Sequence, residues 1–318
     1  MVFPTGREKE INLFSGLING GRLGHAYLFD APRGMGKKTL CSYIVHLIMC
    51  TEHRACMHCN GCLTVSSGAN PDVITVNNGD KASIGVDKIR EMIRDVYIRP
   101  IIADKKVFVI ENAHLLTAGA QNALLKVIEE PPEYAVFFLL CDSINPILQT
   151  IISRVCLIRP APLGTELLQK IVPGCQPFLY HCCEGNVGRL MRLRDDEDFA
   201  SERSAAIDGV MSLVSDDGYS MYDKCAVIES DRKKADAVTE LMLMFVRDVI
   251  LWKNGLEDVI INKDKINEIK TFSESVTAKQ CFAAAECIRT SRAQLGKSGN
   301  LAMAAQTLFM KCREVMHD

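Results

Sequence analysis

The sequence predicts an α/β fold built on a parallel sheet, followed by an all-helical region. In the first half, short continuous apolar runs alternate with helical segments, as expected for strands that are buried on both faces of a parallel sheet. After residue 164 the β-rich runs disappear, and long helical patterns follow. Apolar residues make up 48% of the 318 residues and charged residues 24%, which is an ordinary globular composition.

Five apolar runs are expected to form the strands of the sheet. These runs are 25–30, 72–76, 106–111, 135–140 and 155–160. Helical segments are expected between them at 36–50, 86–98, 119–130 and 145–153, and Pro131-Pro132 ends the third of these. Alternation of this kind is typical of βαβ units, whose strands lie parallel.

Helical sequence dominates the rest of the chain. Short helices are expected within 165–195, and the whole of 202–318 is expected to be helical, with long segments at 235–255, 277–295 and 300–316. The length and the change of composition after residue 164 predict two or three domains. We expect a core at 1–160, a small helical region at 161–201 and a helical domain at 202–318.

Net charge, the length of the apolar runs and the number of cysteines weigh against several classes of function. A net charge of −2 gives no overall attraction to nucleic acid or to an anionic membrane. No apolar run is long enough to span a bilayer, and the N-terminus lacks the architecture of a signal peptide, so a cytoplasmic location without a membrane partner is expected. Fourteen cysteines in such a chain indicate reduced thiols or metal binding rather than a disulfide framework.

Four cysteines fall within a short segment at about 50–62. The spacing C-x5-C-x2-C-x2-C joins Cys50, Cys56, Cys59 and Cys62. Four thiolates match the tetrahedral preference of Zn²⁺ and leave no position for water, so we expect a structural zinc site. His53 and His58 are alternative ligands nearby, and a redox pair at Cys56 and Cys59 is the alternative interpretation.

The stretch "HAYLFDAPRGMGKKTL" at 25–40 is similar to a phosphate-binding loop. In the pattern Gly-x-x-x-x-Gly-Lys-[Ser/Thr], backbone N–H groups at a helix N-terminus hold the phosphates. Gly34, Gly36 and Lys37 keep part of this pattern, whereas Ala31 replaces the first glycine and Lys38 replaces the hydroxyl that binds Mg²⁺. Because an ammonium repels Mg²⁺, we do not expect ATP and Mg²⁺ to bind productively.

The acidic pair that would complete such a site is also altered. The run "KVFVIENAHLL" has Glu111-Asn112 after its apolar strand, where a hydrolase has Asp-Glu. Glu111 can bind a metal through water, but Asn112 cannot accept a proton from an attacking water, so the general base is missing. Two altered parts indicate a decayed site. For the loop alone, an ordinary strand–turn–helix is the alternative.

In their order along the chain, these motifs resemble those of the AAA+ clamp-loader subunits of bacterial DNA polymerase III. The resemblance also rests on "NPDV" at 70–73, "KKVFVIENAHLLTAGAQNALLKVIEEPPE" at 105–133 and "TIISRVC" at 150–156. It covers about residues 1–200, and the helical remainder fits the collar domain of that family by class and length. It implies an AAA+ nucleotide-domain core with a zinc insert, a helical lid and an oligomerising collar.

Within this family the chain is more similar to the delta prime type than to the gamma/tau type. Gamma/tau carries an intact phosphate loop and an Asp-Glu pair, whereas delta prime commonly has a degraded nucleotide site. The resemblance therefore implies a structural subunit without ATPase activity of its own. Its implied partners are gamma/tau and delta subunits and, through the complex, the sliding clamp and primed DNA.

The resemblance also implies roles for individual side chains. Arg154, positioned by Ser153, would reach the ATP of a neighbouring subunit as an arginine finger, since a guanidinium offers bidentate donors to phosphate oxygens. Val155 stands between Arg154 and the cysteine of the family's Ser-Arg-Cys motif. Arg189 in "EGNVGRL" takes the second-sensor position, and Asp142 lies where the family usually has a first-sensor threonine. From spacing alone, Arg154 would be an ordinary surface or ion-paired arginine.

Two other functions stay open at this point. An ATP-hydrolysing subunit of the gamma/tau type would show Mg²⁺-dependent turnover that Lys37→Ala abolishes. A zinc-bearing nucleic-acid-binding module is an alternative of another class. The near-neutral charge and the absence of a basic stripe with interleaved aromatic residues weigh against that module.

Overall fold

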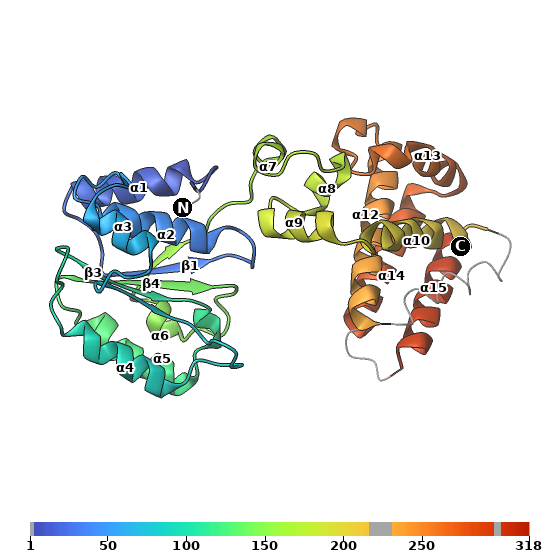
Figure 1. Ribbon diagram of the computed structural model, residues 1–318. Helices are drawn as coiled ribbons and strands as arrows, with labels where there is room; N and C mark the ends of the chain where they lie inside the picture. The colour runs from blue at the N-terminus through green and yellow to red at the C-terminus, as the bar shows by residue number, and fades with distance from the viewer. Residues whose placement is uncertain (1–2, 216–230, 296–299, 318) are drawn as a thin grey trace. The chain divides into compact units, whose positions relative to one another are not determined.

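The computed structural model describes residues 3–215, 231–295 and 300–317, and the chain divides into two compact units (Figure 1). The first unit runs to Gly174 and also includes Glu184–Arg189. The second unit consists of Cys175–Cys183 and the chain from Leu190 onward. The predicted division into core, lid and collar stays a prediction, because these two units do not separate a lid.

The first unit contains a five-stranded sheet in the order β2-β3-β4-β1-β5. All four pairings between neighbouring strands are parallel, which confirms the predicted parallel sheet. Each strand coincides with a predicted apolar run to within two residues. The strands are β1 (Ala26–Asp30), β2 (Val73–Val76), β3 (Lys106–Ile110), β4 (Ala135–Cys141) and β5 (Cys156–Ile158).

Helices cover both faces of this sheet (Figure 1). One face carries α1 (Glu8–Asn19), α2 (Lys37–Met49) and α3 (Asn60–Ser66). The other carries α4 (Val86–Val96), α5 (Ala118–Glu129) and α6 (Gln149–Ile152), and α7 (Thr165–Ile171) follows β5. The predicted helix at 145–153 is shortened to α6, because Leu148 has extended backbone angles (φ −59°, ψ 136°).

The strands are continuously apolar because successive side chains enter two different cores. In β4, Phe137 and Leu139 belong to the core beneath α4, α5 and α6, whereas Val136 and Phe138 belong to the core beneath α1 and α2. The ring of Phe138 contacts that of Phe14, with centroids 6.0 Å apart. Period-two alternation with both faces buried is what a parallel sheet between helical layers requires.

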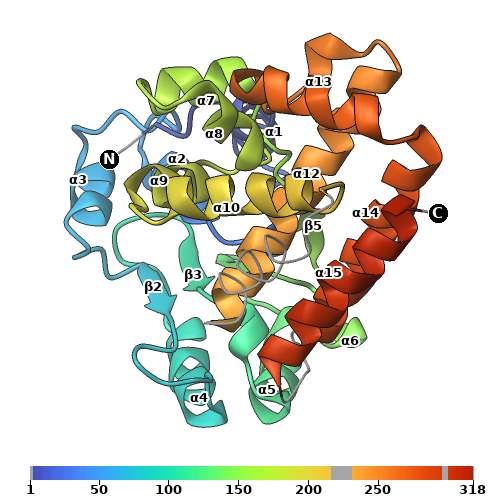
Figure 2. The same ribbon diagram turned by 90° about the vertical axis from the view of Figure 1, so that its right-hand side faces the viewer.

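The second unit is helical in the residues that the structure describes. Its helices are α8 (Pro177–Cys182), α10 (Phe199–Ser212), α12 (Arg232–Lys253), α13 (Ile266–Ser275), α14 (Ala278–Leu295) and α15 (Leu301–His317), with 3-10 turns at Glu257–Val259 and Lys263–Lys265. α9 (Val187–Asp195) begins in the first unit and continues into the second. Figure 2 shows α14 and α15 side by side. α12, α14 and α15 confirm the three long predicted helices. Residues 216–230 and 296–299 of the predicted helical region lie outside the described residues.

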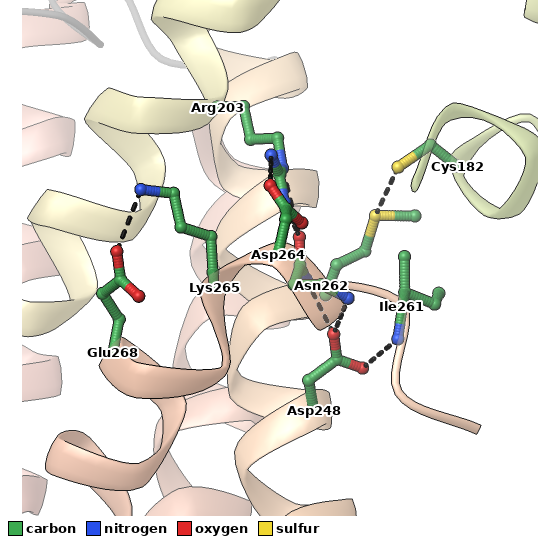
Figure 3. A network of polar contacts seen from close by, with 9 residues as sticks. Cys182, Arg203, Asp248, Ile261, Asn262, Asp264, Lys265 and Glu268 are labelled. Carbon is green, nitrogen blue, oxygen red and sulfur yellow. Dashed lines mark hydrogen bonds and ion pairs between the residues drawn. The ribbon is translucent and has the colours of Figure 1, made fainter. Parts of the chain in front are cut away.

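A fully buried carboxylate fixes the turn between α12 and α13 (Figure 3). Asp248 accepts hydrogen bonds from the backbone N–H of Ile261 at 3.2 Å and of Asn262 at 2.7 Å. It also accepts one from the side-chain amide of Asn262 at 2.7 Å. Each buried donor of this turn therefore has an acceptor, as stable interiors require.

Arg203 on α10 extends this polar network. Its guanidinium donates to Asn262 Oδ1 at 2.8 Å and to the two carboxylate oxygens of Asp264 at 2.7 and 2.8 Å (Figure 3). The same guanidinium lies 3.8 Å from the ring centroid of Phe178 on α8. This cation–π contact joins α8 to α10 within the second unit.

Among the described residues, no helix combines the length and apolarity needed to cross a bilayer.

Candidate functional site

The loop between β1 and α2 lies at the carboxyl edge of the sheet, where parallel α/β proteins commonly bind ligands. Gly34 and Gly36 have φ values of 95° and 81°, in the left-handed region that favours glycine. Gly36 is the N-cap of α2. These two glycines of the predicted phosphate loop are therefore needed for the path of the chain itself.

Lys37 is turned inward in this loop, and its side chain is almost fully buried. Its ammonium donates to the carbonyl oxygens of Ala31 and Pro32, the second at 3.1 Å, and to Asp142 Oδ1 at 2.8 Å. An ammonium has three donors, and these contacts use all three. In this conformation Lys37 offers no donor to a phosphate.

Lys38 and Glu111, which are the altered loop residue and the altered acidic residue, lie together. Lys38 Nζ is 2.8 Å from Glu111 Oε2, and the side chains are 62% and 20% exposed. An ammonium therefore occupies the space beside the carboxylate that a divalent cation would need. Asn112 has left-handed backbone angles, and its amide donates to Asn78 Oδ1 at 2.9 Å.

The segment that carries Arg189 lies directly against the loop. The Asn186 amide donates to Arg33 O at 2.9 Å, and Gly188 N donates to Gly34 O at 3.0 Å. A Cβ on Gly188 would lie 2.6 Å from Gly34 Cα, so only glycine allows this approach. Arg189 Nη1 contacts Glu184 Oε2 at 3.4 Å. The role predicted for Arg189 stays a prediction, and no local signal in the sequence indicates the contacts of Asn186 and Gly188 with the loop.

A cavity of about 460 Å³ opens beside the Lys38–Glu111 ion pair, between α2, α3 and strands β2 and β3. Its lining is mixed: valines such as Val45 and Val109 stand beside polar residues such as Asn70 and Thr75. Residues 31–37 of the loop do not line it, so it is a different space from the phosphate loop.

Arg154 and Ser153 lie together at the end of α6, as the sequence predicts. Ser153 is the C-cap of α6, and Arg154 Nη1 donates to Ser153 Oγ at 3.2 Å and to Thr150 O at 3.1 Å. Arg154 Nε is 2.9 Å from Glu129 Oε1, and the two side chains are 40% and 45% exposed. Nothing in the local sequence indicates the partner Glu129.

The four cysteines of the predicted metal site converge. One sulfur from each of Cys50, Cys56, Cys59 and Cys62 lies within 4.8 Å of the others. Thiolates around one Zn²⁺ ion at about 2.3 Å are roughly 3.8 Å apart, so the donor set fits a single ion after a small contraction. Glu52, Cys56 and His58 form a second, exposed group of possible ligands.

Backbone geometry explains why the sulfurs meet. Cys50 is the C-cap of α2, and Cys59 is the N-cap of α3. A Cβ on Gly61 would lie 1.9 Å from Met49 O, so glycine lets α3 approach the end of α2. Burial raises the pKa of the Cys59 thiol, but hydrogen bonds from the backbone N–H groups of Cys62 and Thr51 outweigh burial and lower that pKa to about 6. A thiolate is the form that binds metal.

Comparisons with known proteins agree with these motifs. A family model for the DNA polymerase III delta subunit matches residues 6–163, and one for the C-terminal part of the delta subunit matches residues 197–304. The chain is 27% identical to the delta prime subunit of Bacillus subtilis, over 83% of each chain. It is 26% identical to the tau subunit of the same organism, over 93% of this chain and 58% of tau.

A solved structure is also similar. The gamma subunit-related protein of Thermotoga maritima aligns over 97% of this chain and 99% of its own, with 16% identity and a TM-score of 0.41. The two family models cover both units, and the curated relatives extend along most of the chain. The chain belongs to the family of bacterial DNA polymerase III clamp-loader subunits.

Proposed function

We propose that the chain is a clamp-loader subunit of the delta prime type, which does not hydrolyse ATP and supplies Arg154 to the ATP site of a neighbouring subunit. Its partners would be gamma/tau and delta subunits in the cytoplasm. The assembled complex would load a sliding clamp onto primed DNA. The domains would be the predicted AAA+ core, lid and collar.

The ion pair between Lys38 and Glu111 carries the first part of this proposal. A Mg²⁺ ion at this place would have to displace an ammonium that lies 2.8 Å from the carboxylate. The ammonium and the metal ion carry like charges and would repel each other at this distance. The inward contacts of Lys37 and the amide at Asn112 support the same conclusion, because neither provides the chemistry that γ-phosphoryl transfer needs.

The exposure of Arg154 supports the second part. Its side chain is 40% exposed at the end of α6, so its guanidinium is accessible to a group of another subunit. Within the described residues, no protein group accepts a hydrogen bond from Nη2, whereas Nη1 donates two hydrogen bonds and Nε lies in the ion pair with Glu129. A guanidinium with a free edge can stabilise charge on a transferring phosphoryl group.

A structural zinc ion at Cys50, Cys56, Cys59 and Cys62 belongs to the same proposal. The close approach of four sulfurs supports it. The ion would crosslink the end of α2 to the start of α3 and would have no open position for catalysis.

The test compares ATP turnover by the isolated chain and by the complex with gamma/tau and delta subunits, clamp and primed DNA. We expect no turnover by the isolated chain. We expect Arg154→Ala to lower kcat of the complex without preventing assembly, and the exposed Arg99→Ala control to leave kcat unchanged. Steady Mg²⁺-dependent hydrolysis by the isolated chain, lost in Lys37→Ala, would support the gamma/tau-like alternative. An unchanged rate in the Arg154→Ala complex would remove the trans role.

A further inference from the structure

Glu129 contacts the side chain to which the trans role is assigned. Its Oε1 lies 2.9 Å from Arg154 Nε. Glu129 is the last residue of α5, and Arg154 follows the C-cap of α6, so the ion pair joins the ends of two helices. Pro131 and Pro132 follow closely and restrict the backbone there, so the helix cannot continue beyond this point.

Two of the three guanidinium nitrogens of Arg154, Nε and Nη1, have partners within the chain, and Nη2 has none among the described residues. Glu129 forms an ion pair with Nε, while Thr150 O and Ser153 Oγ accept hydrogen bonds from Nη1 at 3.1 and 3.2 Å. A guanidinium is planar, so fixing two of its nitrogens fixes the direction of the third. The two N–H donors of Nη2 therefore have a defined direction before any partner binds.

We propose that Glu129 is a positioning residue for Arg154 and holds the guanidinium plane so that Nη2 is presented to the triphosphate of the adjoining subunit. This inference rests on the proposed trans role of Arg154. Both side chains are nearly half exposed, and such pairs contribute little to folding stability. Removal of the carboxylate should therefore affect the chemical step and leave folding unchanged.

The expected effect is a moderate one. Without Glu129, the long Arg154 side chain samples more rotamers, and fewer of them place Nη2 correctly. Poor positioning of a catalytic group commonly lowers rates by up to about 100-fold. Because Thr150 and Ser153 still hold Nη1, we expect Glu129→Ala to lower kcat of the assembled complex by roughly three- to tenfold, with KM for ATP unchanged.

The experiment is a double-mutant cycle in the assembled clamp-loader complex. ATP turnover is measured with Glu129→Ala, Arg154→Ala and the double variant. Glu129→Gln keeps a hydrogen-bond acceptor and should recover part of the rate. Glu130→Ala, at the neighbouring exposed acid, is the matched control and should leave kcat unchanged. Thermal unfolding of each variant should match that of the unaltered chain.

The outcomes separate this inference from the proposed function. The expected result is that Glu129→Ala lowers kcat when Arg154 is present and has no further effect when Arg154 is absent. If Glu129→Ala leaves kcat unchanged, or lowers it equally in the Arg154→Ala background, the positioning role is wrong while the trans role stands. If Arg154→Ala itself has no effect, the trans role and the positioning role are both wrong.

Discussion

Replacement of the buried carboxylate of Asp248 should strongly destabilise the helical unit. Asp248→Ala removes the acceptor of three donors in the turn, namely the backbone N–H groups of Ile261 and Asn262 and the side-chain amide of Asn262. It also removes the 3.4 Å contact from Arg247, whose half-exposed guanidinium can turn to water. Two of the three hydrogen bonds are fully buried and one is partly buried. A buried donor left unpaired costs about 1–3 kcal/mol, so we expect a loss of roughly 3–5 kcal/mol in the free energy of unfolding.

The assay can be confined to the affected unit. The chain has a single tryptophan, Trp252, which lies on α12 one turn after Asp248, so its fluorescence reports unfolding of this unit in urea. Asp258→Ala, at an exposed carboxylate in the following turn, is the control and should change stability by less than about 0.5 kcal/mol. Asp248→Asn keeps one acceptor oxygen and should fall between the two. A loss below about 1 kcal/mol for Asp248→Ala would refute the reasoning.

Two further predictions concern zinc binding by the four cysteines and the loss of folding stability at acid pH. Cys59→Ser should remove one of four ligands and lower the zinc content measured by atomic absorption, whereas Cys156→Ser, outside the cluster, should leave it unchanged. Zinc retained at one ion per chain in Cys59→Ser would exclude Cys59 as a ligand. The hydrogen bond from Arg203 lowers the pKa of the Asp264 carboxyl below its ordinary value of 3.8. Stability from this pair is therefore present above pH 3.8 and is lost as pH falls through the lowered pKa, and Asp264→Asn should flatten that acid dependence of unfolding. If the free energy of unfolding of Asp264→Asn depended on acid pH as it does in the unaltered chain, Asp264 would not be the source of that dependence.

Local pattern predicted most of the sheet and the long helices. Continuous apolar runs such as 135–140 indicate burial on both faces, and this signal does not depend on distant residues. The short helix α3 was not predicted, because its start depends on Cys59 as N-cap and on the close approach of Gly61 to Met49. A helix of seven residues is too short to show the apolar periodicity that predicts helices, and its packing against another segment does not change that pattern.

Within the candidate sites too, contacts between residues close in sequence could be predicted, whereas contacts between distant residues could not. Convergence of the four cysteines follows from short spacing, which confines the sulfurs to a small volume whatever the rest of the fold. The contact of Lys37 with Asp142 joins residues 105 apart and requires the order of the strands to be known. The contact of Glu129 with Arg154 requires two helix ends to be placed side by side. Charged residues in loops give no indication of which partner they will meet.

The segment between Cys50 and Cys59 follows an unfavourable path. His53, Ala55 and Met57 have φ values of 49°, 53° and 63°, and each such residue costs on the order of 1 kcal/mol because its Cβ crowds the following carbonyl. Ala55 also belongs to the apolar core beneath α1 and α2. An ion bound as proposed by the four cysteines would offset this backbone cost. It would thereby also favour the packing of Ala55 on this face of the sheet.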